Sequence, residues 1–272
     1  MATFTQTYPT DLKYTEWEQL AEFFPPQRRG RPRKWATWLI INAIVYVTRT
    51  GCQWRMLPKD LPPWQTVYGY FWRWRRSGLW ERLNAVLVQK TRQKAGRNPQ
   101  PSAASIDSQS VKTSEGGEAR GVDVHKQTNG RKRHVVVDTL GLLLVVVVHS
   151  ASIPDGTGGK LTLQRLFDRI KRNVHNRWCR LKKLWADGAY EDIGGYVRQH
   201  FGWTVEIARR PPGAKGFTIL PRRWVVERSF GWFGRYRRLA RDYEHTTSAS
   251  EAMVYLASIR RMLKLIVPER AH

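Results

Sequence analysis

The first third of the chain carries apolar residues at helical spacing. Residues 15–24 begin with a Thr-x-x-Glu capping-box pattern and stop before two prolines, which predicts a short helix. Residues 35–50 are apolar on nearly every side, as expected of a buried central helix. Two more helices are predicted over 62–77, where prolines suit the first turn, and over 80–94. This part of the chain should therefore form a small helical bundle.

Beyond residue 103 the pattern changes to short β-branched runs that alternate with helical segments. Residues 133–137 and 142–148 flank turn residues and predict a β-hairpin. The other predicted elements are a strand over 103–109, an amphipathic helix over 158–173, a strand over 181–186, a helix over 196–200, a strand over 204–208 and a helix over 222–241. Three strands followed by alternating helices and strands is the ribonuclease-H-like order, with a mixed sheet and helices on its faces.

The composition shifts between the two parts. Residues 94–105 contain glycine, two prolines and small polar side chains, which is typical of a linker. The chain is therefore predicted to be α/β overall. A small all-helical, helix-turn-helix-like domain is expected over residues 1–95, a linker over 96–103 and a ribonuclease-H-like domain over 104–272.

Charge adds the next constraint. The chain has 47 Lys and Arg against 22 Asp and Glu, a formal net charge of +25, and it is rich in Trp and Tyr. Such self-repulsion favours a polyanionic partner, and nucleic acid releases counterions when its phosphates are neutralised. A ribosomal-type basic protein is the plain alternative. The aromatic content and a few carboxylates in special positions argue for an enzyme acting on DNA.

Cysteine usage and hydropathy limit the cellular setting. Cys52 and Cys179 lie far apart and match no zinc-finger spacing, which suits a reducing compartment. The polar N-terminus does not resemble a signal peptide, and the longest apolar run, 142–148, is too short to span a bilayer. We expect a soluble cytoplasmic protein, associated with the bacterial nucleoid and not with a membrane.

Three carboxylates stand out by position. Asp107 interrupts an apolar strand, Asp187 ends another strand before a glycine, and Glu227 lies in a basic helical segment with Arg223 one turn earlier. Cleaving a DNA phosphodiester is well served by two divalent cations held by carboxylate oxygens, and such carboxylates must converge from separate elements. Each carboxylate also has a structural alternative, namely a turn cap, an ordinary Asp-Gly turn or an ion pair with Arg223.

Several basic clusters are candidate DNA contacts, and each has a solvated charged segment, such as a linker or a helix face, as its plain alternative. Arg29 and Arg31 frame an Arg-Gly-Arg-Pro sequence that suits an A·T-rich minor groove. The remaining candidates are Arg73, Arg75 and Arg76 on the third predicted helix, and Arg131, Lys132 and Arg133 before the hairpin.

A family resemblance unites these features. The chain is similar to bacterial DDE transposases of the insertion-sequence-5 family in residues 51–58, 63–68, 105–112, 130–134, 185–190 and 220–228. The resemblance implies a ribonuclease-H-like catalytic domain in which Asp107, Asp187 and Glu227 bind two Mg²⁺ or Mn²⁺ ions. It also implies water-driven cleavage at terminal inverted repeats, attack of the freed 3′-hydroxyl on target DNA, and a homodimer or larger assembly on paired ends.

The resemblance extends to two arginines, and the pattern around Glu227 departs from that of the family at two positions. The Arg–Glu spacing of the family is kept by Arg223, which is thereby implied as a phosphate contact. The family's tyrosine position holds Leu220, and its lysine position holds Gly234, with Arg235 one residue later as a replacement. Two other interpretations stay open: a DNA-binding regulator with an inactive catalytic fold, and a two-metal nuclease without strand transfer.

Overall fold

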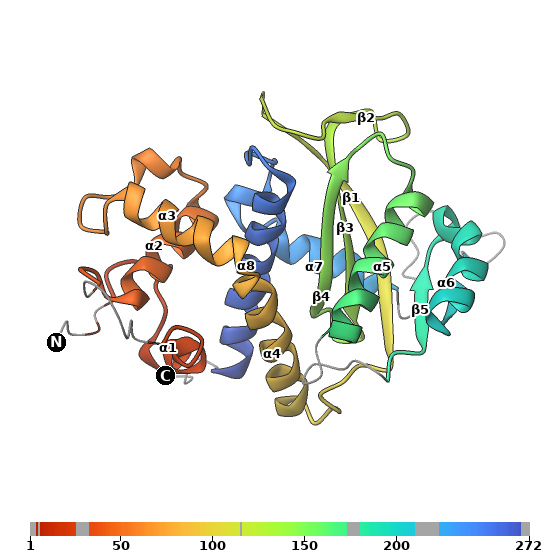
Figure 1. The fold of residues 1–272 in the computed structure, drawn as a ribbon, viewed down its shortest axis with the longest axis horizontal. Helices are drawn as coiled ribbons and strands as arrows, with labels where there is room; N and C mark the ends of the chain where they lie inside the picture. Colours follow the sequence, from red (N-terminus) through yellow and green to blue (C-terminus); the bar gives the residue numbers. More distant parts are fainter. Residues whose placement is uncertain are drawn as a thin grey trace.

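The structure is a computed structural model that describes residue 4 and residues 6–25, 33–114, 116–172, 180–209 and 223–267. Four helices form the N-terminal part, as the periodicity predicts (Figure 1). They are α1 (Tyr14–Ala21), α2 (Thr37–Thr50), α3 (Trp64–Arg76) and α4 (Leu79–Lys94), with a 3-10 turn at Trp54–Met56. Gly51, at φ 75°, ends α2 in the left-handed conformation that glycine adopts without strain.

A six-stranded mixed sheet forms the second part. Its strands are β1 (Ala103–Lys112), β2 (Gly121–Asp123), β3 (Thr128–Asp138), β4 (Leu143–Ser150), β5 (Lys183–Ala186) and β6 (Thr204–Ile207). β1 pairs antiparallel with β3, and β3 with β4, whereas β5 lies parallel to both β1 and β6. This arrangement confirms the predicted ribonuclease-H-like order, with β1 and β3 longer than expected and β2 not foreseen.

Helices cover the sheet. α5 (Asp155–Arg172) crosses in front of the strands in Figure 1, and α7 (Trp224–Phe233) lies behind them. A 3-10 segment at Gly188–Ile193 and α6 (Gly194–Phe201) connect β5 to β6. The valines of β4 are buried, which explains why this strand is a continuous apolar run and does not alternate.

The C-terminal helix differs from the prediction. The helix expected over 222–241 ends at Phe233, because the chain turns at Gly234 and extends at Tyr236. A second helix, α8 (Thr247–Ile266), then begins where the Thr246 side chain accepts a hydrogen bond from the Ala249 amide. The long helix prediction was therefore wrong, and α8 was missed.

α8 stands between the N-terminal helices and the sheet, with contacts to α2, α4 and β4 (Figure 1). Most of its residues are buried, so one continuous hydrophobic core runs from α2 through α8 into β4. The predicted domain boundary near residue 96 remains a prediction. Among the described residues, no helix combines the length and apolar character that a bilayer crossing requires.

Candidate active site

Asp107 lies in the middle of β1, opposite Val135 of β3. Its side chain is 14% exposed, and one carboxylate oxygen accepts a hydrogen bond from the Ser108 amide at 2.7 Å. Burial raises the pKa of Asp107 to about 6, although Arg223 acts in the opposite direction. The site therefore holds a carboxylate that gains from a nearby cation.

Asp187 is brought beside Asp107 by strand pairing. The parallel register joins Ala104 to Leu184 and Ser105 to Trp185, so its continuation past the end of β5 leads from Asp107 to Asp187. Asp187 caps the 3-10 segment that follows β5, accepting a hydrogen bond from the Ala189 amide at 3.0 Å. The cap turns the chain at the carboxyl end of the strand, where ligand sites of open α/β sheets form.

Glu227 completes the cluster from α7. Arg223 precedes it by four residues, so the two side chains share one face of the helix. One terminal nitrogen of Arg223 lies 3.1 Å from Asp107, 3.1 Å from Asp187 and 3.3 Å from Glu227. Burial lowers the pKa of Arg223, but the three carboxylates outweigh it and the pKa ends above its usual value. The structure thus gathers the three predicted carboxylates around one positive charge.

The donor set suits a hard divalent cation. Three carboxylates from a strand, a strand end and a helix surround one point, and that point is taken by the Arg223 guanidinium. Mg²⁺ binds oxygen ligands at about 2.0–2.1 Å, so the carboxylates would close further around a metal than around nitrogen. No group of three His, Cys, Asp or Glu side chains in the described part of the chain is assembled as a metal cluster by itself. Arg223 stands where positive charge is required, and the carboxylates fit the implied group chemically.

Family models match both parts of the chain. Residues 98–261 match the model described as "Transposase DDE domain", which spans more than half of the chain and includes all three carboxylates. The chain belongs to the DDE transposase family. Residues 12–84 match a second model, described as "Putative transposase of IS4/5 family".

Curated relatives cover smaller parts. An uncharacterized protein, y4sN, of Sinorhizobium fredii is 30% identical over 81 residues, 29% of this chain and 64% of the relative. An uncharacterized 16.2 kDa protein of insertion element IS402 from Burkholderia cepacia is 28% identical over 114 residues, 39% of this chain and 75% of the relative. The matched segment thus spans less than two thirds of y4sN. No solved structure matches the transposase chain.

The basic cluster before the hairpin requires a correction. Arg131, Lys132 and Arg133 are 0%, 5% and 3% exposed because they lie in β3, between β1 and β4. Arg131 donates to the carbonyls of Glu118, Glu244 and His245, and Arg133 to those of Leu239 and Arg241. The expectation that these three residues lie at a DNA-facing surface is wrong. The two arginines instead tie the loop before α8 to the sheet.

Lys132 contacts two carboxylates that the sequence analysis does not single out. Its ammonium lies 3.1 Å from Asp155 and 3.4 Å from Asp123, and Asp155 also accepts a hydrogen bond from the Ser108 hydroxyl at 2.7 Å. Because Ser108 follows Asp107 on β1, this buried network braces the strand that carries the first carboxylate of the transposase. The sequence pattern places Asp155 in a loop, whereas it is the first residue of α5. Its position before an amphipathic segment was the available signal.

The other predicted DNA contacts differ in exposure. Arg73 and Arg76 are exposed on the last turn of α3, whereas Arg75 is half-buried and donates to the Thr246 hydroxyl at 2.8 Å. Arg235 is exposed just beyond α7. Arg29 and Arg31, like Cys179, fall outside the described residues. Their contacts with DNA remain predictions.

Proposed function

We propose that this transposase cleaves DNA hydrolytically at the ends of its element and joins the freed 3′-hydroxyl to target DNA. The observation that carries the proposal is the convergence of Asp107, Asp187 and Glu227 on a single cationic point. Mg²⁺ or Mn²⁺, two ions per site, would be held by these carboxylates and would supply activation of the attacking oxygen and charge neutralisation at the leaving oxygen.

The chain's own residues have separable roles in this proposal. Asp107 and Asp187 sit on adjacent strands of a rigid sheet, so their relative positions are set by backbone hydrogen bonds. Glu227 comes from a helix and is the most exposed of the three at 46%, which leaves it accessible to a substrate. Arg223 provides positive charge beside the scissile phosphate, to which a guanidinium can donate two hydrogen bonds.

The expected partners follow from the same chemistry. Double-stranded DNA is the substrate, as terminal inverted repeats and as target, and its phosphates offset the net charge of +25. Joining two element ends requires two active sites, so we propose a homodimer or larger assembly. The N-terminal helices α1–α4 are the proposed DNA-reading part, with Arg73 and Arg76 exposed on α3.

Cleavage and strand transfer on duplex DNA carrying the element's ends, with and without Mg²⁺, test the proposal. Asp187→Asn should abolish both reactions, because it removes one carboxylate while keeping the side-chain shape. Asp192→Asn is a matched control, since Asp192 is exposed in the same segment and pairs with Lys160 away from the cluster.

The outcomes separate the three interpretations. Metal-dependent cutting and joining, both abolished in Asp187→Asn and kept in Asp192→Asn, support the transposase reaction. Cutting without joining would indicate a two-metal nuclease. Tight DNA binding without cutting by either protein would indicate a regulator with an inactive catalytic fold.

A further inference from the structure

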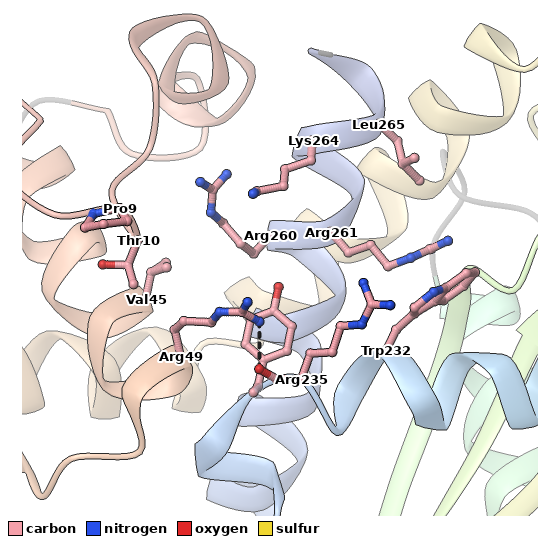
Figure 2. A pocket seen from close by; sticks show the side chains of 11 residues that line it. Pro9, Thr10, Val45, Arg49, Trp232, Arg235, Arg260, Arg261, Lys264 and Leu265 are labelled. Atoms are coloured by element: carbon pink, nitrogen blue, oxygen red, sulfur yellow. Dashed lines mark hydrogen bonds between the residues drawn. The ribbon is translucent and has the colours of Figure 1, made fainter. Parts of the chain in front are cut away.

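A basic pocket lies where α2, α7 and α8 meet, apart from the three carboxylates (Figure 2). It has a volume of about 350 Å³. Five cationic side chains line it: Arg49, Arg235, Arg260, Arg261 and Lys264. No Asp or Glu is among the described residues that line the pocket. The concentration of like charge in a concave site indicates an anionic ligand.

Most cations of the pocket have no ion-pair partner among the described residues. Arg260 pairs with the buried Glu16, and Arg49 donates to the backbone carbonyl of Arg235 at 2.7 Å (Figure 2). Within the described part of the chain, no carboxylate forms an ion pair with Arg235, Arg261 or Lys264. Three positive charges therefore line the pocket without an ion-paired acid, and Asp138 offsets the charge of Arg261 only through a longer-range interaction.

Arg261 lies in an electrostatically unfavourable environment. Its guanidinium lies 3.1 Å from the centre of the Trp232 ring, and Arg228 lies 4.6 Å from the centre of the same ring. Burial and then the neighbouring Arg228 lower the pKa of Arg261 to about 10. An anion in the pocket would relieve both the desolvation and the repulsion.

The pocket and the proposed active site both include residues of α7. Glu227 and the pocket residue Trp232 both belong to α7, and Arg235 lies two residues beyond its last residue, Phe233. Gly231 lies between Glu227 and Trp232 in the sequence. It is exposed, and a Cβ placed there would have no neighbour within 4 Å. Glu227 and Trp232 are five residues apart, so at about 1.5 Å per residue about 7.5 Å separates them along the helix axis.

We propose that this pocket binds the DNA sugar-phosphate backbone near the phosphate held at the carboxylates. Arg261 and Lys264 of α8 and Arg235 after α7 contact the phosphate oxygens, and Trp232 holds the Arg261 guanidinium in place. The inference rests on the proposed function, because that function makes DNA the substrate. It assigns α8 to DNA positioning in addition to its place in the core.

The test is the salt dependence of DNA binding, measured by fluorescence anisotropy on a labelled duplex in EDTA. Removing one phosphate-binding cation should reduce the slope of log K against log[salt] by about 0.9. Arg261→Gln with Lys264→Gln should therefore reduce it by about 1.8, and Lys264→Gln alone, at an exposed position, by about 0.9. Lys182→Gln with Arg198→Gln removes equal charge from exposed positions near β5 and α6 and should leave the slope unchanged.

An unchanged slope in both pocket variants would overturn the proposal. Inorganic phosphate that binds the wild type but not the double variant, with an unchanged DNA slope, would indicate a free-anion site and overturn it equally. Thermal unfolding of each variant checks that the fold is retained, and the single exposed substitution keeps the test valid if the double variant unfolds. Because binding in EDTA needs no cleavage, a failure of the catalytic proposal stays distinguishable from a failure of this one.

Discussion

The Arg223 guanidinium is the cation that holds three carboxylates together, and Arg223→Gln removes it. Breaking a buried ion pair from one side costs about 3–5 kcal/mol. The Asp187 and Glu227 side chains keep 30% and 46% of their surface in solvent, so we expect the lower end, about 3 kcal/mol. For a chain of this size the unfolding midpoint should fall by about 6–10 °C in EDTA at low salt.

The same variant should respond more strongly to divalent cations than the wild type. Without Arg223, three carboxylates face one point with no competing charge, so Mg²⁺ binds them more readily. A ligand at 100 times its Kd stabilises by about 2.7 kcal/mol, which is close to the expected loss. Thermal unfolding by circular dichroism, with EDTA and with increasing MgCl₂, measures both effects.

A matched control and two possible outcomes test the prediction for Arg223→Gln. Arg209 pairs with Glu191 at 2.8 Å, but both side chains are more than half exposed, so Arg209→Gln should cost about 1 kcal/mol or less. Equal stability of wild type and Arg223→Gln in EDTA would refute the reasoning. So would equal stabilisation of the two proteins by Mg²⁺, because it would mean that Arg223 does not occupy the cation position.

Three further predictions concern stability, measured by urea unfolding. Burial raises the pKa of Glu251 from 4.5 to about 7. Because the pKa of this carboxyl is higher in the folded than in the unfolded protein, the wild type loses stability as the pH rises from about 4.5 to about 7. Glu251→Gln should thus add about 3 kcal/mol at pH 8 and nothing at pH 4, whereas a pH-independent difference would contradict the assignment. Arg92→Met should cost about 3–5 kcal/mol, since it strands the buried carboxylate of Asp138; a loss under 1 kcal/mol would show that the pair is dispensable. Gly130→Ala should cost about 1–3 kcal/mol, because its Cβ would meet the Val111 carbonyl oxygen at 2.0 Å, while Gly194→Ala, in open space, should be tolerated.

Most of the order of helices and strands could be predicted from the sequence, because local patterns of apolar and polar residues encode it. The apolar run at 142–148 has the composition of a buried strand, and residues 35–50 have that of a buried helix. The C-terminal helix was missed although residues 252–263 are rich in apolar side chains. The predicted helix over 222–241 ran through Gly234, where the chain in fact turns, and this left the following segment without an element of its own.

The sequence indicates the individual residues of the candidate site, whereas the fold determines that they converge. Asp107, Asp187 and Glu227 stood out individually, because a carboxylate at the centre or end of an apolar strand is costly without a partner. Their convergence depends on the parallel register of β1 with β5 and on α7 packing against the sheet. Strand order and register are long-range properties, and no local pattern specifies them.

The sequence determines the net charge of the protein but not where its charged side chains lie in the fold. The net charge of +25 follows from composition alone and indicates a polyanionic partner. Three consecutive cations at 131–133 suggested an exposed patch, yet they are buried because β3 has a partner on each side and loop carbonyls accept their hydrogen bonds. Arg49, Arg235 and Arg261 are scattered along the chain, yet they line one pocket. Only the tertiary structure decides which charges meet water and which meet the core, since that depends on the neighbours that folding supplies.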